Sequence, residues 1–357
     1  MVLNIDGILD LFSEERSKET RIATILGFLM MATVGRREVS PCTLGWFLRG
    51  MRRAADLGQV QLYFDGFGRY CGHVVWTCLP INREREMLQH GPRILVAEDF
   101  SMQGELWILD FRALYGEWRE ILIDMQTLLP DAGKSISYFR YKEGVRLAKR
   151  ISRCRLDYPG NSSGSRSFCE WGAFLASDDG VAFRQATRQT LDFAREVGFA
   201  AQLLSLLPKY ADMPLDKVFG HFRNAIQRRQ YRLYVSESGC AAGFFTWAWM
   251  EARDVRSKRM ESPRTVEYGQ WNEGRDLFLC DAVATQEGVG DVLEDLRGRW
   301  HSSEKLFVFP RGDDDRADNT CAFPVYAGRR MLPDIAGPAE GVLDIAQALL
   351  DGDVCLD

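Results

Sequence analysis

Residues 94–116 read ILVAEDFSMQGELWILDFRALYG, and they carry an aspartate inside an apolar strand. Asp110 follows Trp107–Leu109 within the segment WILDF. A carboxylate in such a place must be paired, hydrogen-bonded or shifted in pKa, because an isolated buried charge is costly. Asp110 is therefore a candidate for a functional site. The alternative is an aspartate that ends the strand and caps the next turn.

The same arrangement returns 171 residues later, around Asp281 in the segment LFLCD at residues 277–281. In both places an aromatic residue stands ten positions before the aspartate, with a glycine between them. The aromatic residues are Phe100 and Trp271. Asp281 is therefore a second candidate of the same kind.

Further positions coincide when the sequence is shifted by 171 residues. Glycine, aromatic and acidic positions recur over about 100 residues, which is the signature of an internal repeat. The matching pairs are Gly27 and Gly198, Phe28 and Phe199, Leu62 and Leu233, Tyr63 and Tyr234, Gly72 and Gly243, Trp76 and Trp247, Leu122 and Leu293, and Asp124 and Asp295. We therefore expect related domains at residues 1–158 and 170–357, joined by a Gly/Ser-rich linker at 159–169.

Each half shows the same order of predicted elements, from hydrophobic spacing and turn residues. In the first half they are helices at 19–32 and 44–55, strands at 60–64 and 72–78, a strand ending at Asp110, a helix at 118–129 and a strand at 136–141. In the second half they are helices at 181–206 and 218–229, strands at 231–235 and 242–249, a strand ending at Asp281, a helix at 289–300 and a strand at 306–309. This order predicts an α/β fold with mixed sheets and flanking helices, not a doubly wound parallel sheet.

Composition and charge exclude several classes of protein. The chain of 357 residues is 46% hydrophobic and 27% charged, which is typical of a globular protein, and its net charge of −5 argues against a general nucleic-acid binder. No apolar run reaches the roughly 18 residues of a membrane span, and no signal peptide is recognisable, so we expect a cytoplasmic protein without stable membrane insertion. The nine cysteines are dispersed without a C-x-x-C pair, so we predict no disulfide framework and no metal site.

Residues 94–116 resemble the most characteristic segment of the toxin-activating lysine acyltransferases that act on RTX toxins. In that family a V-A-E-D-W-type turn leads into a strand that ends in the catalytic aspartate, which falls on Asp110. Met125 with Pro130 and Asp131 is similar to the family's M-x-x-x-x-P-D helix end. Residues 225–248, AIQRRQYRLYVSESGCAAGFFTWA, resemble the family's helix-to-hairpin segment. The resemblance covers most of 20–150 and 195–312 and implies two tandem GNAT-like (acyl-CoA N-acyltransferase-like) domains.

The resemblance also implies an activity. Members of the family transfer a fatty acyl group from acyl carrier protein to lysine side chains of a protoxin. The chain is accordingly expected to use acyl-ACP, or acyl-CoA, as its donor substrate, with no bound cofactor. Such a reaction needs an amine that loses a proton and a thioester carbonyl that is polarised. The family forms homodimers, so a duplicated chain is expected to be an internal pseudo-dimer.

The chain departs from the family at the histidine that works with the strand aspartate. The family motif is P-x-His-x-x-x-Pro, and residues 208–214 place Tyr210 at the histidine position, while Arg37 is its occupant in the first half. Arginine is not a base at neutral pH, and tyrosine needs a large pKa shift to become one. Two other histidines, His73 in a predicted strand and His221 on a helix, are therefore also candidates for the catalytic site. For each, the alternative is a surface or hydrogen-bonded core histidine.

The second predicted helix of each half is basic. Its arginines are Arg49, Arg52 and Arg53 in the first half and Arg223, Arg228 and Arg229 in the second. A solvated helix face is one interpretation, and docking of an acidic partner such as acyl carrier protein is the other. Because the family histidine is missing, a catalytically degenerate binding or regulatory protein is an alternative to an enzyme. Acylation of a small-molecule amine is a third possibility, since the fold accommodates many acceptors.

Overall fold

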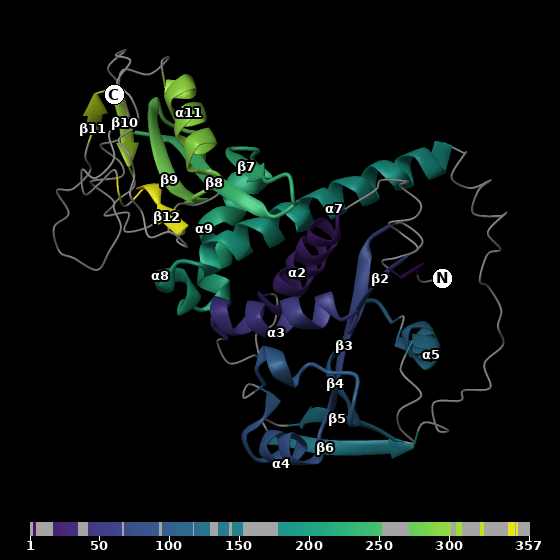
Figure 1. Ribbon diagram of the computed structural model, residues 1–357. Coiled ribbons are helices and arrows are strands. Elements are labelled where there is room, and N and C mark those ends of the chain that lie inside the picture. Colours follow the sequence, from purple (N-terminus) through teal and green to yellow (C-terminus); the bar gives the residue numbers. More distant parts are fainter. Residues whose placement is uncertain are drawn as a thin grey trace. The chain divides into compact units, whose positions relative to one another are not determined.

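The computed structural model describes residues 3–4, 17–34, 42–65, 68–92, 95–116, 118–128, 135–142, 145–152, 178–251, 271–300, 305–308, 322–324, 342–346 and 348. By their internal contacts the residues divide into two compact units, each with its own sheet (Figure 1). Unit 1 comprises Met1–Arg16 and Leu48–Asp192, and unit 2 comprises Ser17–Phe47 and Phe193–Asp357. Among the described residues, no helix combines the length and the apolar character needed to cross a bilayer.

Unit 1 is built on six strands in the order β1-β2-β3-β4-β5-β6. Their bounds are β1 (Leu3–Asn4), β2 (Val60–Phe64), β3 (Tyr70–Leu79), β4 (Glu105–Ala113), β5 (Ser135–Lys142) and β6 (Val145–Ser152). Neighbouring strands are antiparallel except β4 and β5, which run parallel and pair only at residues 106–108 and 136–138. The described helices are α3 (Leu44–Asp56), which leads into β2, α4 (Ile81–His90), the 3₁₀ turn η2 (Ala97–Asp99) and α5 (Trp118–Leu128).

Unit 2 repeats this plan with β7 (Tyr231–Val235), β8 (Ala241–Met250), β9 (Asp276–Thr285), β10 (Lys305–Val308) and β11 (Ala322–Pro324), in the order β11-β10-β9-β8-β7. Only β9 and β10 are parallel, at residues 277–279 and 306–308. A further strand, β12 (Val342–Asp344), pairs antiparallel with the end of β9. The described helices are α2 (Lys18–Val34), α8 (Pro208–Ala211), α9 (Leu215–Gln227), α11 (Val289–Trp300) and the part of α7 (Asp178–Ser205) from Phe193 onward.

Strand registers in the two sheets are related by the 171-residue shift. Gly72 pairs with Ala113 and Gly243 with Ala284. In both sheets the register shifts by one residue, a β-bulge, directly after the residue that pairs with the aspartate. The partner of Asp110 is Val75, and that of Asp281 is Thr246. The hairpins β2–β3 and β7–β8 also share their register and their bulge. The predicted α/β fold with mixed sheets is therefore present in both units.

The bulge decides which way each aspartate points. Side chains alternate along a strand, so Asp110 without a bulge would lie on the face of Leu106 and Ile108, which pack with Ile121 of α5. Because the register skips Leu109, Asp110 lies instead on the face of Trp107. Asp281 is turned in the same manner, away from the cluster that packs on α11.

Helix α2 belongs to unit 2, where it packs against α7. A Cβ at Gly27 would lie 1.8 Å from the Ala194 carbonyl oxygen, and one at Gly198 would lie 1.8 Å from that of Ala23. The two contacts map onto each other under the 171-residue shift. Helices that touch backbone to backbone need a residue without a side chain at the crossing, which explains both glycines. We had expected contiguous domains at 1–158 and 170–357, whereas the compact units place residues 17–47 with the second sheet.

Most predicted elements are present within a few residues of their expected bounds. Helix α4 and strands β1, β6, β11 and β12 were not predicted, and α8 forms where only a proline turn was expected. In unit 1, β6 begins shortly after β5 and pairs with it as a hairpin. The hydrophobic spacing of the sequence did not distinguish these two strands. The expected linker at 159–169 lies outside the described residues.

Candidate functional site

The candidate site of unit 1 lies where β3 and β4 pair. His73 lies opposite Arg112, and Val75 lies opposite Asp110, so His73 and Asp110 are diagonal neighbours on one face of the sheet. His73 Nε2 and Asp110 Oδ2 are 2.9 Å apart and share a hydrogen bond. Two of the residues that the sequence singled out are thus brought together, although 37 positions separate them.

The second ring nitrogen of His73 also has a partner, because His73 Nδ1 is hydrogen-bonded to the hydroxyl of Tyr70. If Tyr70 donates to Nδ1, the neutral ring carries its proton on Nε2 and donates it to Asp110. The order Tyr70, His73, Asp110 forms a chain along which a proton can move. Tyr70 was not predicted as a site residue, and its position three residues before His73 in a strand is no distinctive signal.

The exposed fraction of the side chain differs sharply between His73 and Asp110. The His73 side chain is 0% exposed, whereas that of Asp110 is 27% exposed. A molecule in solvent can therefore reach the carboxylate but not the imidazole. The arrangement allows Asp110 to contact a substrate amine while His73, on the buried side, orients the carboxylate through its hydrogen bond.

In unit 2 the aspartate has a different partner. Tyr210 on α8 donates a hydrogen bond of 2.5 Å to Asp281 Oδ1, and the Asp281 amide donates to Thr246 Oγ1 at 3.1 Å. The position of His73 is taken by Phe244, so the strand offers no polar neighbour there and α8 supplies one. Asp281 is 0% exposed and Tyr210 only 2% exposed. The pair is closed to solvent.

His221 lies beside this pair. Its ring meets that of Tyr210 edge-on, with centroids 5.7 Å apart, and the side chain is buried. His221, Tyr210 and Asp281 therefore form one buried cluster from α9, α8 and β9. Arg37, the remaining candidate for the catalytic site, lies outside the described residues.

A second difference concerns the outer edge of the aspartate's strand. Beyond Ile108, no strand in the described part of unit 1 pairs with this edge of β4, since β5 parts from β4 after Tyr138. The corresponding edge of β9 is taken by β12, with Asp344 opposite Val283. Ile345 and Ala346, which follow β12, are 0% exposed and complete the core against α11. Among the described residues, the strand edge beside Asp110 is thus unpaired, and the one beside Asp281 is paired with β12.

The V-A-E-D turn before β4 has a structural role. Arg83 on α4 donates from Nε and Nη2 to the two carboxylate oxygens of Asp99, each at 2.6 Å, and the Val96 amide donates to Asp99 Oδ2 at 2.8 Å. Burial opposes the charge, but these hydrogen bonds outweigh it and hold the pKa of Asp99 below its usual value. The turn therefore anchors the start of β4 to α4.

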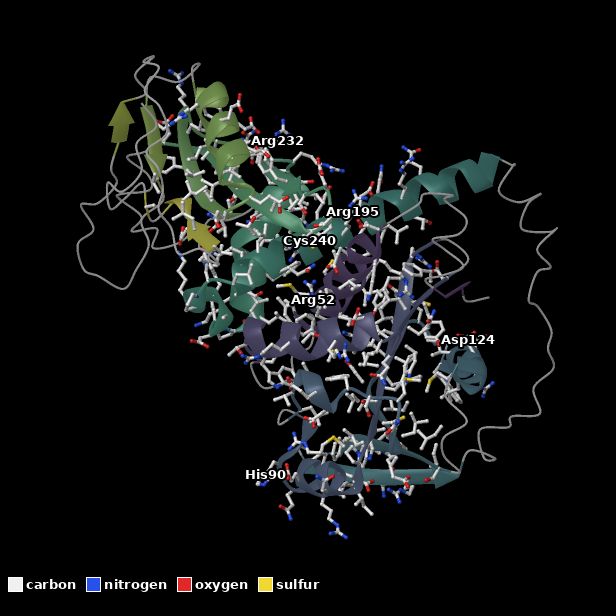
Figure 2. All side chains as sticks on the ribbon, in the orientation of Figure 1. Arg52, His90, Asp124, Arg195, Arg232 and Cys240 are labelled. Atoms are coloured by element: carbon white, nitrogen blue, oxygen red, sulfur yellow. The ribbon has the colours of Figure 1, made fainter. Side chains whose placement is uncertain are left out.

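The predicted basic helices are present, and most of their arginines are exposed. Arg49, Arg52 and Arg53 are exposed on α3, where Figure 2 labels Arg52. Arg53 pairs with Asp56 at 3.0 Å. In unit 2, Arg223 on α9 stacks over Phe219 at 5.8 Å, and Arg229 pairs with Glu196 at 3.3 Å. Arg228 is half-buried at the helix end. The two sets thus lie on, or directly after, the equivalent helices of the two halves, but their neighbours differ.

A mixed sheet with an aspartate turned inward at a bulge is consistent with an acyltransferase fold. Residues 189–318 match the model of the RTX toxin acyltransferase family. This match runs from α7 past β10 and includes residues 225–248, from which the family was inferred, whereas residues 94–116 lie outside it. The family indicates an acyltransferase of the toxin-activating kind. No curated protein matches the chain.

Proposed function

We propose that the chain moves a fatty acyl group from acyl carrier protein to an amine, and that the amine is a lysine side chain of a partner protein. The observation that carries the proposal is the His73–Asp110 pair beside the part of β4 that no described strand pairs with on its outer edge. The matched family supports acyl transfer in general. The ACP donor, the lysine acceptor and the GNAT-like description rest on the resemblance of the sequence.

The reaction joins an amine nitrogen to a thioester carbonyl. The acceptor ammonium first loses a proton to Asp110, whose carboxylate is held in place by His73 Nε2. The neutral amine then attacks the carbonyl carbon, a tetrahedral intermediate forms, and the C–S bond breaks. The thiolate that leaves takes a proton, so an ammonium and a thioester become an amide, a thiol and one released proton. Asp110 is the catalytic residue, and His73 and Tyr70 are the residues that position it.

The unpaired outer edge of β4 suits the pantetheine arm of the donor. After Ile108, β4 continues to Ala113 without a strand on its outer edge among the described residues, and its backbone amides and carbonyls face that side. A pantetheine arm is extended and contains two amides, so it can pair with such an edge as a strand does. This would bring the thioester next to Asp110.

We assign the chemistry to unit 1 because the equivalent site of unit 2 is closed. Asp281 is fully buried, its strand edge is covered by β12, and Lys209 of α8 forms an ion pair with Asp344 of β12. Tyr210 donates a hydrogen bond to one oxygen of the Asp281 carboxylate, in place of a histidine. Unit 2 thus favours the degenerate, binding or regulatory alternative for its own half of the chain. A small-molecule amine is the remaining alternative for the acceptor.

The repeat supports an internal pseudo-dimer. Strand registers, bulges and turn hydrogen bonds recur at one shift, and within unit 2 the contacts Gly27–Ala194 and Gly198–Ala23 are reciprocal. Leu44 donates from its amide to the Met213 carbonyl at 3.0 Å, and Leu215 to the Cys42 carbonyl at 2.9 Å, which is again the same contact shifted by 171. Reciprocity of this kind is the property of a two-fold interface. We propose that a duplicated gene joined two such copies into one cytoplasmic chain.

Docking of the acidic carrier protein is assigned to the basic face of α3. Arg49, Arg52 and Arg53 are exposed on consecutive turns of one helix. Positive charge on one face speeds encounter with an acidic protein and makes the rate depend on salt.

The test is acyl transfer from purified acyl-ACP to candidate acceptor proteins and amines. We expect Asp110→Asn to lower kcat by about 10²–10⁴-fold, the range typical of a lost general base. The matched control is Asp281→Asn, which should leave the rate within a few-fold for a correctly folded protein. Transfer that survives in Asp110→Asn, or that is lost only in Asp281→Asn, would contradict the assignment. Absence of transfer to every acceptor would contradict the enzyme itself.

A further inference from the structure

Among the described residues, no strand pairs with the outer edge of β7 in unit 2, whereas the equivalent edge in unit 1 is paired. In unit 1, β1 pairs antiparallel with β2, with Leu3 opposite Phe64 and Asn4 opposite Tyr63. All five residues of β2 are buried. Under the 171-residue shift β2 corresponds to β7, which ends its sheet, and no other described strand adjoins its outer side.

The burial of β7 reflects this difference. Its residues are half-buried or exposed throughout, and Val235 at its end is 46% exposed. An edge of this kind presents backbone N–H and C=O groups that can pair with another extended chain, and natural sheets commonly cover or protect it. The edge is therefore a surface on which a strand from a partner can add.

A pocket of about 520 Å³ adjoins this edge. Its lining comes from the start of α2, from α7 and from β7 and the turn before it. Three arginines, Arg195, Arg229 and Arg232, line it together with one acidic residue, Glu196. Figure 2 labels Arg195 on α7 and Arg232 on β7. Arg229 pairs with Glu196 at 3.3 Å and Arg232 with Asp295 at 3.5 Å, so three guanidinium groups face two carboxylates here and the complementary ligand is an anion.

The two features meet on the same residues, because Leu233 and Val235 line the pocket and belong to the edge. Phe199 adds an apolar floor, and Tyr231 lies beside Glu196. A ligand that suits both features needs an extended backbone, apolar side chains and negative charge. A folded helical protein provides the charge but not the free backbone.

We propose that the edge of β7 and its arginine-lined pocket bind an acidic, extended segment of a partner protein by strand addition. The segment runs antiparallel to β7, opposite Tyr234 and Val235, as β1 runs opposite Tyr63 and Phe64 in unit 1. Its carboxylates meet Arg195 and Arg229. This surface is separate from the Asp110 site, and the proposal does not depend on acyl transfer.

The test uses a fluorescent synthetic peptide of alternating Glu and Val, with the full-length protein. A second peptide carries N-methyl groups on alternate amides, and a third has Lys in place of Glu. Strand addition requires that the N-methylated peptide bind at least tenfold more weakly, because each lost hydrogen bond weakens binding and two such losses approach a factor of ten. The Lys peptide should not bind. Amide hydrogen exchange should slow at residues 231–235 when the Glu peptide is present.

Protein variants supply the second arm. Arg195→Gln and Arg229→Gln should each weaken the Glu peptide several-fold, more at low salt than at high salt. Arg223→Gln is the matched control, since Arg223 is exposed in the same unit but does not line the pocket. Melting temperatures identify any variant that fails to fold. Equal binding of the N-methylated peptide, equal binding of the Lys peptide, or binding only by acyl carrier protein would overturn the proposal.

Discussion

At the scale of the residue, the two aspartates show how one position can acquire two environments. Asp110 keeps part of its surface exposed and is hydrogen-bonded to His73, whereas Asp281 is sealed and is hydrogen-bonded to Tyr210. The strand register is the same in both, so the difference comes from single substitutions and from what covers the strand edge. A carboxylate that meets solvent can exchange protons with a substrate, whereas one that is fully buried is closed to a substrate.

Tyr210→Phe is predicted to destabilise unit 2. The substitution removes the donor to a fully buried carboxylate, so the free energy of unfolding should fall by about 1–3 kcal/mol. The measurement is denaturant unfolding compared with Tyr115→Phe, at a tyrosine that is 61% exposed and should change stability by less than about 0.5 kcal/mol. Equal stability of the two variants would show that the hydrogen bond to Asp281 contributes little.

Asp99 is expected to make the free energy of unfolding depend on pH. Its folded-state pKa lies below the ordinary value near 3.9, so its contribution is present above that pH and is lost as the pH falls through the folded-state pKa. We expect Asp99→Asn to lower stability at pH 7 by about 1.5–3 kcal/mol, as for hydrogen bonds to charged groups, and to cost progressively less below pH 4. Thermal melts across this range test it. A deficit that stays constant down to pH 2 would contradict the pairing with Arg83.

At the scale of the element, glycine spacing explains how α2 packs with α7. The crossing within unit 2 brings each helix's backbone against the other at Gly27 and Gly198. Neither glycine is needed for helix formation, where it costs about 1 kcal/mol relative to alanine. The contact between backbones is the compensating gain.

Gly27→Ala and Gly198→Ala are predicted to be destabilising by about 1–3 kcal/mol each, because the added methyl group would overlap a backbone carbonyl and force the helices apart. Gly298→Ala on α11 is the matched control. Nothing lies within 4 Å of a Cβ there, so this change should stabilise by up to about 1 kcal/mol. Urea unfolding of the three variants decides, and a stabilising effect at Gly27 would exclude the close crossing.

At the scale of the whole molecule, the chain carries two sheets of the same plan with different terminal strands. In the described part of the chain, unit 1 has β1 paired with β2 and an unpaired edge of β4 beside Asp110, and unit 2 has an unpaired edge of β7 and an edge of β9 paired with β12. Each additional strand thus closes a surface that the other unit leaves open. A duplicated protein is free to divide its roles in this way, with chemistry on one copy and partner binding on the other.

If the repeat replaces a homodimer, the full chain should sediment as a monomer. The reciprocal helix contacts of a two-fold interface are already made inside one chain, so no equivalent surface is left for a second copy. Analytical ultracentrifugation at micromolar concentrations measures this. An obligate dimer of full-length chains would contradict the simplest form of the pseudo-dimer.

The sequence by itself determined the order of helices and strands, the 171-residue repeat and the two strand aspartates, because these depend on local periodicity and on residue type. It also placed His73 and Tyr210 among the candidates, without indicating that each lies against its own aspartate. Tertiary structure alone decided those pairings, the exchange of α2 into unit 2 and the covering of Asp281 by β12. These depend on contacts between residues far apart in the chain, and a bulge of one residue is enough to turn an aspartate from one face of a sheet to the other.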